Sequence, residues 1–187
     1  MAFSVVLDTC AISPNYLRDT LLRLAVAGTY RPLWSHDILV ELERNLAQFT
    51  TAEQAARVVA KMTEHFADAE VVGYRPLVDA MPNHPKDRHV LAAAVRANAA
   101  AIVTFNLGDF PTAMLKPFAV AAIHPDEFLL NQLGLAPGTV ISTLYKQVEG
   151  YQRPPRDVPA LLAALEASGV TEFAAEVRRH LPPQGRT

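Results

Sequence analysis

The sequence predicts an α/β domain on a parallel sheet that helices cover on both faces, followed by a helical tail. Two observations carry this prediction. Up to Pro125, short apolar runs rich in β-branched residues alternate with longer segments of helical periodicity, which is typical of a parallel sheet. Beyond Pro125 the strand-like runs stop and only helical segments follow.

Four short segments have the pattern of strands. Residues 3–7 are apolar and β-branched, and the run stops at Asp8, so we expect a buried strand that ends in a polar loop. Residues 101–104 form a second buried run of this kind, which ends at Thr104. The other two strands are predicted at residues 70–72 and 118–122.

Three helices are predicted between the strands at residues 3–7 and 70–72. Residues 16–27 place leucines at helical spacing and end at a glycine. Ser35 can act as the N-cap of a second helix, whose apolar stripe extends to Phe49. A capping box that begins at Thr51 opens the third helix.

The remaining helices follow a loop bracketed by prolines 76 and 85. They are predicted at residues 86–98, 127–133, 138–152, 159–167 and 171–181. We therefore divide the chain into an α/β domain, residues 1–128, and a helical C-terminal extension, residues 129–187.

Composition excludes several classes of protein. Half of the 187 residues are apolar and 19% are charged, which excludes a disordered chain. A formal net charge of −2 argues against a protein that coats nucleic acid through bulk charge, although a local basic patch stays open. The single cysteine, Cys10, indicates a reducing compartment. We see no secretory signal and no apolar stretch of about 18 residues, so we expect a cytoplasmic protein without a membrane span.

Acidic side chains follow two of the predicted strands. Asp8 comes directly after the first strand, and Asn106 and Asp109 lie in the loop after the strand that ends at Thr104. Binding sites of parallel sheets form beyond the carboxyl ends of the strands, so these side chains can meet there. Taken alone, each aspartate is more often a turn former or a helix cap.

Three further acids are open to two interpretations each. Asp87 lies on the apolar side of its predicted helix, where a carboxylate needs a hydrogen bond or a cation, but it can equally cap that helix. Its neighbours Lys86 and Arg88 could balance its charge or hold a phosphate. Glu41 and Glu43 flank opposite sides of one apolar stripe, and periodicity does not choose between them.

Four segments in this order resemble the PIN domain family and are most similar to its VapC-type toxin ribonucleases. They are VVLDT at residues 5–9, LVELERN at 39–45, PKDRHVLAAA at 85–94 and IVTFNLGDF at 102–110. The resemblance covers residues 3 to about 125, and its third and fourth segments together are the specific ones.

The resemblance implies a three-layer α/β/α domain with a central parallel sheet and a metal-dependent ribonuclease site. By position, the acids that would bind the metal and act in catalysis are Asp8, Glu41, Asp87 and Asp109. Thr104 and Asn106 match supporting polar residues of the last segment. The family commonly has Asn where this chain has Cys10. The resemblance also implies an RNA substrate, a cognate antitoxin protein and a possible homodimer.

Metal-dependent hydrolysis of a phosphodiester requires such a set of acids, whichever family the protein belongs to. Phosphodiester hydrolysis needs a nucleophilic water and compensation of the charge that develops on the phosphate, and Mg²⁺ or Mn²⁺ can supply both. These cations prefer oxygen ligands. Without metal, converging carboxylates repel one another and some of their pKa values rise, so we expect a loose or partly protonated site that tightens when metal binds. We expect a raised pKa for the Cys10 thiol as well.

Two functions other than a nuclease are compatible with parts of the sequence. The first is a catalytically weakened PIN-like module that binds RNA or a partner protein without cleavage, which the departure at Cys10 motivates. The second is a phosphoryl-accepting enzyme of the dehalogenase type using Asp8. This one is disfavoured because its chemistry usually wants a second aspartate at position 10.

Contacts to RNA and to partners are less sharply predicted. The cations nearest the four segments are Lys86, Arg88, Arg96 and Lys116. The histidines have no zinc-site spacing, and His84 and His89 lie near the predicted site. The apolar helices at residues 16–27 and 36–49 could offer a dimer face or a partner groove. The tail either helps to hold RNA or packs as a helical extension, and its aromatic and basic residues are Tyr145, Lys146, Tyr151, Arg153, Arg156, Arg178 and Arg179.

Overall fold

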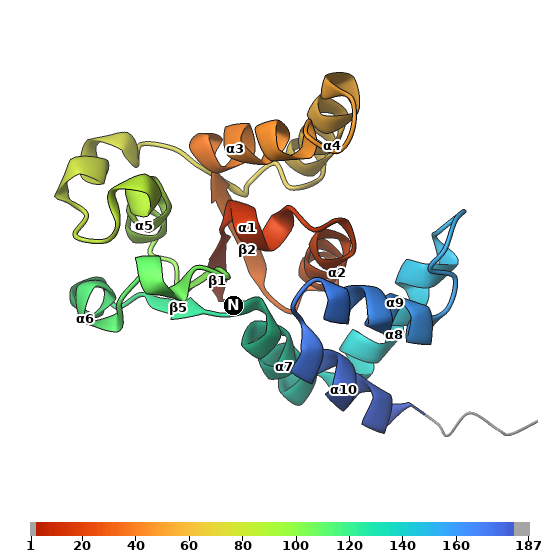
Figure 1. Cartoon of the computed structure of the whole chain (residues 1–187). Helices are drawn as coiled ribbons and strands as arrows, with labels where there is room; N and C mark the ends of the chain where they lie inside the picture. Colours follow the sequence, from red (N-terminus) through yellow and green to blue (C-terminus); the bar gives the residue numbers. More distant parts are fainter. Residues whose placement is uncertain (1–2, 182–187) are drawn as a thin grey trace, which may run out of the picture. The chain divides into compact units, whose positions relative to one another are not determined.

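A computed structural model of the chain describes residues 3–181 and is shown in Figure 1. The chain divides into two compact units, residues 1–15 with 30–124, and residues 16–29 with 125–187. The second unit therefore takes almost all of α2 (Asn15–Val26) from the N-terminal part of the sequence. The outermost residues of the two predicted domains, 1–2 and 182–187, lie outside the described residues.

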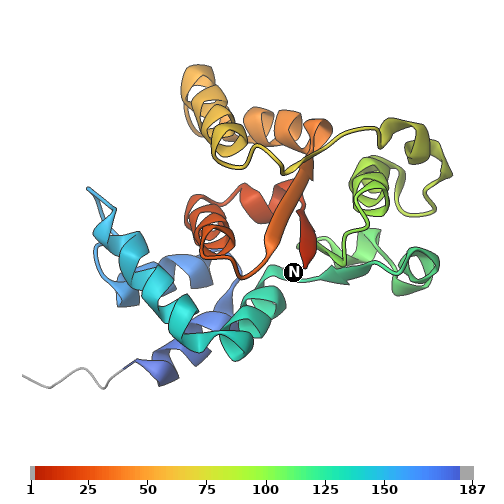
Figure 2. The same cartoon turned by 180° about the vertical axis from the view of Figure 1, so that it is seen from behind.

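The first unit is built on a parallel sheet in the order β3-β2-β1-β4-β5, which Figure 2 shows from behind. Its strands are β1 (Ser4–Leu7), β2 (Arg31–Ser35), β3 (Glu70–Val71), β4 (Ala101–Val103) and β5 (Ala121–Ile123). The predicted parallel α/β fold is confirmed, and the last strand begins three residues later than predicted. The register pairs Leu7 with Val103, so β1 and β4 end side by side.

Strand β2 is missing from the sequence prediction because Pro32 interrupts its pattern. The sheet accepts this proline because successive N–H groups of a strand serve opposite neighbours. The Arg31 N–H donates to Phe3 O of the β1 side, and the Trp34 N–H donates to Ala69 O of the β3 side. Position 32 would donate toward β3 as Trp34 does, but β3 pairs with β2 only from Trp34 onward. The missing donor therefore costs the sheet no ladder hydrogen bond.

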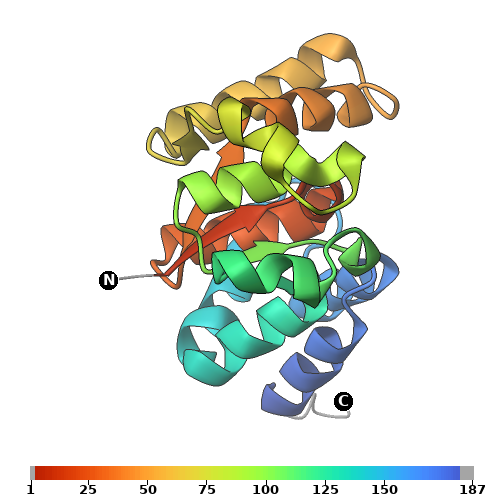
Figure 3. The ribbon, with the colours of Figure 1, turned by 90° about the vertical axis from the view of Figure 1, so that its left-hand side faces the viewer.

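Helices of the first unit pack on this sheet and on one another. They are α1 (Thr9–Ile12), α3 (His36–Leu46), α4 (Ala52–His65), α5 (Arg88–Arg96) and α6 (Thr112–Leu115). Helix α5 packs on β1, β2 and β4, and Figure 3 looks onto this side of the unit, with α3 and α4 lying side by side. The predicted caps are confirmed: the Ser35 hydroxyl accepts the Ile38 N–H, and Thr51 and Gln54 form the capping box.

Several predicted helix boundaries are wrong, among them the end of the helix predicted at residues 138–152, which stops at Glu149. Helix α3 ends at Leu46, and Phe49 is 88% exposed instead of extending the apolar stripe, because the chain turns there toward the cap of α4. The helix predicted from residue 86 begins at Arg88. Pro85 starts a separate 3₁₀ turn, η2 (Pro85–Asp87), so Asp87 ends this turn and stands at the N-cap position of α5 instead of lying within the helix.

The second unit is helical, as predicted. Its C-terminal helices are α7 (Pro125–Leu135), α8 (Pro137–Glu149), α9 (Val158–Ala167) and α10 (Thr171–His180). Buried Asp126 accepts the backbone N–H groups of Glu172 and Phe173, which holds α7 against the start of α10. Helix α2 joins them through the Thr20 hydroxyl, which lies 2.9 Å from Gln147 Oε1.

The apolar stripes of α2 and α3 are buried within the chain. Leu17, Leu21 and Leu24 of α2 have no exposed surface, and Ile38 and Leu42 of α3 have none either. These side chains therefore pack within the chain, whereas Val26, Val40 and Phe49 of the same predicted segments are exposed. Among residues 3–181, no helix combines the length and the apolar character that a membrane crossing requires.

Candidate metal centre

The candidate site lies where the sheet reverses its direction of growth. The chain adds β2 and β3 on one side of β1, then crosses to the other side and adds β4 and β5. Binding sites of open α/β sheets form at such a switch point, beyond the carboxyl ends of the strands. Here the first residues after β1 and β4 are Asp8 and Thr104, and the Asp8 N–H donates to Val103 O at 3.0 Å.

Asp8 is held in place by hydrogen bonds to both carboxylate oxygens. Its Oδ1 accepts the Thr9 N–H at 2.7 Å, and its Oδ2 accepts the Thr104 hydroxyl at 2.7 Å. The side chain is buried, with 3% of the residue exposed. Two such short bonds hold the Asp8 carboxylate in one orientation at the end of β1.

Cys10 links the ends of β1 and β4. Its Sγ donates to Asp8 Oδ2 at 3.1 Å and accepts the Phe105 N–H at 3.2 Å. Burial and the charge of Asp8 raise the pKa of the thiol to about 12, which confirms the expected direction. The thiol therefore stays protonated at neutral pH and positions its neighbours instead of acting as a nucleophile.

Glu41 reaches the site from α3. Its Oε2 accepts the Thr9 hydroxyl at 3.0 Å, and its Oε1 lies 3.4 Å from His89 Nε2. The interaction with His89 lowers the pKa of Glu41. Burial alone would lower the pKa of His89, but the neighbouring Glu41 carboxylate outweighs burial and raises it. Glu41 is thus the glutamate of the Glu41 and Glu43 pair that contacts the residue next to Asp8.

Asp87 is the least satisfied acid of the site. Only 4% of the residue is exposed, and its Oδ2 is buried without a hydrogen-bond partner. It precedes α5 at the N-cap position but makes no side-chain capping bond, so the capping interpretation does not account for it. Burial, the charge of Asp8 and a hydrogen bond with the Asp109 side chain raise the pKa of Asp87 to about 6. The expected rise of a pKa among the acids is confirmed.

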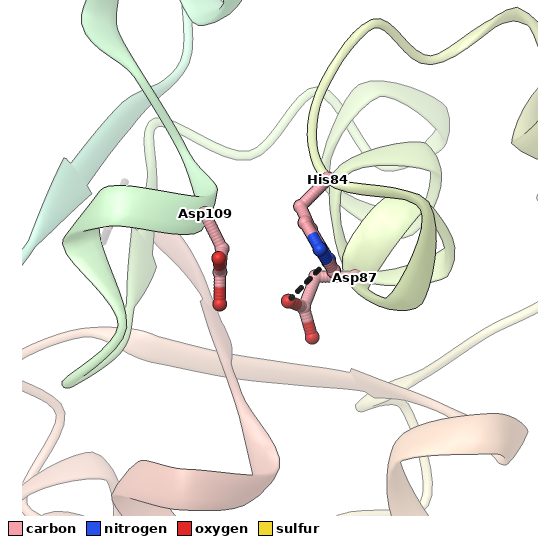
Figure 4. A group of neighbouring side chains, drawn as sticks. All are labelled: His84, Asp87 and Asp109. Carbon is pink, nitrogen blue, oxygen red and sulfur yellow. Dashed lines mark ion pairs between the residues drawn. The ribbon is translucent and has the colours of Figure 1, made fainter.

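Asp109 ends the 3₁₀ turn η3 (Leu107–Asp109) after β4. The loop that carries it is fixed by the Thr104 hydroxyl, which accepts the Asn106 N–H at 3.0 Å. The Asp109 carbonyl accepts the His84 N–H at 3.3 Å, which ties this loop to the segment before α5. Figure 4 shows the side chains of His84, Asp87 and Asp109 facing one another, and one ligand atom from each lies within 4.8 Å of the others.

His84 is the residue of this cluster that sequence reasoning left out of the site. Its signal in the sequence is the spacing: His84 stands three residues before Asp87, with a proline directly after it. The Asp87 N–H donates to the His84 carbonyl at 2.9 Å, so a tight turn keeps these two residues close together. Reading Asp87 as part of a longer α-helix concealed this arrangement.

The predicted basic residues are placed differently from one another. Lys86 is exposed beside Asp87, and its charge partly offsets the rise of the Asp87 pKa. The Nε of Arg88 donates to the Asn83 carbonyl at 3.3 Å. In the tail, Arg178 and Arg179 form surface pairs with glutamates, and the Tyr151 hydroxyl donates to Asp19.

The donor set fits a divalent cation. Asp8, Asp87 and Asp109 interact closely enough for the first and third to raise the pKa of the second. A buried, ionised carboxylate oxygen without a partner is costly, and a cation bound here would satisfy it. Carboxylate oxygens are the ligands that Mg²⁺ and Mn²⁺ prefer.

Comparisons with known proteins match both parts of the chain. Residues 4–108 match the family model of the PIN domain, and residues 125–179 match that of the VapC50 C-terminal domain. A protein of Mycobacterium tuberculosis named "Putative ribonuclease VapC50" is 49% identical over 110 residues, which are 59% of this chain and 64% of that relative. The chain thus aligns with less than two thirds of the relative's length. No solved structure matches the chain.

Proposed function

Because this chain belongs to the PIN domain family, whose model matches more than half of it, we propose that it is a metal-dependent endoribonuclease. The proposed reaction is hydrolysis of RNA phosphodiester bonds with Mg²⁺ or Mn²⁺. The observation that carries the proposal is the buried, unpartnered Oδ2 of Asp87 between two other acids. The ionised form of such a group destabilises the fold, and a cation in the cluster would remove that cost, as is typical of a functional site.

We assign the metal to four acids. Asp8, Asp87 and Asp109 would hold it directly, with Glu41 as the fourth acid, and Thr104 and Asn106 would support them. When bound, the cation makes a water nucleophilic and compensates the charge that develops on the phosphate. The Thr104 hydroxyl fixes the orientation of Asp8, and Thr9 does the same for Glu41. These bonds preorganise the acids before metal and substrate arrive.

Two basic residues next to the acids are the proposed contacts to RNA phosphates. Lys86 is exposed and adjacent in sequence to Asp87, and Arg88 follows Asp87 directly. Phosphate contacts supply most of the affinity for nucleic acid, and they carry no sequence information. These residues therefore account for binding but not for the choice of cleavage site.

The partners and the setting follow from the relative and stay proposals. A protein named as a VapC ribonuclease supports a toxin role, with a cognate antitoxin protein as partner, a possible homodimer, and action in the cytoplasm. The matches to two successive family models support a nuclease domain at residues 1–128 and a helical extension at residues 129–187.

Cleavage of total cellular RNA tests the proposal. The purified protein is incubated with RNA in Mn²⁺, Mg²⁺ or EDTA, beside D87N and the control D79N, which changes an exposed acid of the turn η1 (Arg75–Ala80). Discrete new ends should require metal, vanish in D87N and persist in D79N. RNA binding without new ends in any condition would favour the non-cutting module that the departure at Cys10 motivates.

A further inference from the structure

The loop before α5 gives the acid cluster a nitrogen donor. The Asp87 N–H donates to the His84 carbonyl at 2.9 Å, which closes the turn that contains η2 and keeps residues 84 and 87 close together. The His84 N–H in turn donates to the Asp109 carbonyl at 3.3 Å. Backbone bonds thus fix His84 relative to both acids, although its side chain is 55% exposed.

The side-chain distances do not explain His84 as an ion-pair partner. His84 Nδ1 lies 4.0 Å from Asp87 Oδ2, which is longer than a hydrogen bond, and that oxygen has no partner. Surface ion pairs of this kind contribute little to stability. Yet the imidazole faces the gap between the two carboxylates in Figure 4, and its donor atom lies within 4.8 Å of theirs. A cation in this gap would satisfy all three groups.

We propose that His84 is a nitrogen ligand of the cation held by Asp87 and Asp109, and that it makes the site prefer Mn²⁺ to Mg²⁺. The inference rests on the proposed metal site and goes beyond it by adding a ligand and a preference. Mg²⁺ takes oxygen ligands almost exclusively, whereas imidazole nitrogen suits transition metals, and Mn²⁺ accepts both donor types. The turn closed by the Asp87 N–H and the His84 carbonyl is what brings the nitrogen to the cluster.

Pulsed electron paramagnetic resonance on the metal-loaded protein tests this assignment directly. The ¹⁴N coupling of Mn²⁺ is measured in the wild-type chain, in H84A and H84Q, and in H65A, which removes an exposed histidine of α4 as the matched control. Affinities for Mn²⁺ and Mg²⁺ are measured in the same four proteins by calorimetry. Because the His84 side chain is half exposed, both substitutions should leave folding intact, and circular dichroism checks this.

The expected result is a ¹⁴N coupling in the wild-type chain and in H65A that is lost in H84A and H84Q. Mn²⁺ affinity should fall on the order of tenfold without His84, about 1.4 kcal/mol, while Mg²⁺ affinity changes little. Mn²⁺ bound without ¹⁴N coupling, or a coupling that persists in H84A, would overturn the inference and leave the proposed nuclease standing. A wild-type chain that binds neither ion would overturn both.

Discussion

Replacing Asp87 by asparagine should stabilise the metal-free protein, which is the opposite of the usual result for a buried polar residue. The pKa of Asp87 is raised from 3.8 to about 6, which is about 2 units, and each unit is worth about 1.4 kcal/mol. The ionised carboxylate therefore costs the folded state roughly 3 kcal/mol above pH 6. The neutral amide of D87N avoids this cost but still needs hydrogen bonds, so we expect a net gain of about 2 kcal/mol.

The raised pKa of Asp87 also predicts how the stability difference between the wild-type chain and D87N changes with pH. Because the folded-state pKa lies above the unfolded one, the folded protein binds more protons between about pH 4 and pH 6. Wild-type stability should fall as the pH rises through this window and stay lower above it. The advantage of D87N should therefore be largest at pH 7.5 and shrink toward pH 4.

Urea unfolding in EDTA at these pH values measures the difference, with D79N as the control that removes an exposed acid. The gain of D87N corresponds to about 4–8 °C in Tm for a chain of this length. Adding Mn²⁺ at about 100 times its Kd should stabilise the wild-type chain by about 2.7 kcal/mol and reverse the order, because D87N lacks a ligand. If D87N is no more stable than the wild-type chain at pH 7.5 in EDTA, the argument from the raised pKa is refuted.

Two further outcomes follow from the bonds around Asp8. T104V removes the hydroxyl that donates to Asp8 Oδ2 and should lower the free energy of unfolding by about 1.5–3 kcal/mol. T104S keeps the hydroxyl and should lower the free energy of unfolding by less. Equal losses of stability in urea titrations of the two variants would contradict this. Cys10 should resist iodoacetamide at pH 8 in the folded protein, because the rise of its pKa from 9.0 to about 12 lowers the thiolate fraction about a thousandfold, and it should react once guanidinium unfolds the chain. Mass spectrometry measures the labelling of the folded and unfolded chains. Equal rates in both states would show that the fold does not raise the pKa of Cys10.

Periodicity and capping patterns decided most of the fold. Ser35 and Thr51 mark the helix starts, and the structure has both caps. Strand β2 is absent from the sequence prediction because Pro32 breaks the local pattern. Only its pairing with β3, which begins at Trp34, shows that the sheet needs no N–H donor at position 32. Phe49 was placed on a buried stripe because its spacing fits, but the chain turns before reaching it. Local signals thus predict elements well and their ends poorly.

The acids themselves stand in the sequence, but their convergence is a property of the fold. Residue types and order placed Asp8 and Asp109 at strand ends, and the resemblance to a known family selected Glu41 over Glu43. The sequence could not show that β4 lies beside β1, because that pairing joins residues almost a hundred positions apart. It is this pairing that puts the Thr104 hydroxyl on Asp8.

The positions of Asp87 and His84 could not be predicted from the local sequence pattern. Helical periodicity assigned Asp87 to the apolar face of α5, whereas Pro85 starts a 3₁₀ turn that ends at Asp87. This turn leaves His84 Nδ1 4.0 Å from Asp87 Oδ2, and the Asp87 side chain makes no capping bond to α5. Sequence alone therefore determined which acids the chain carries. Tertiary structure decided which of their atoms remain without a partner, because that depends on what the other strands and loops bring alongside.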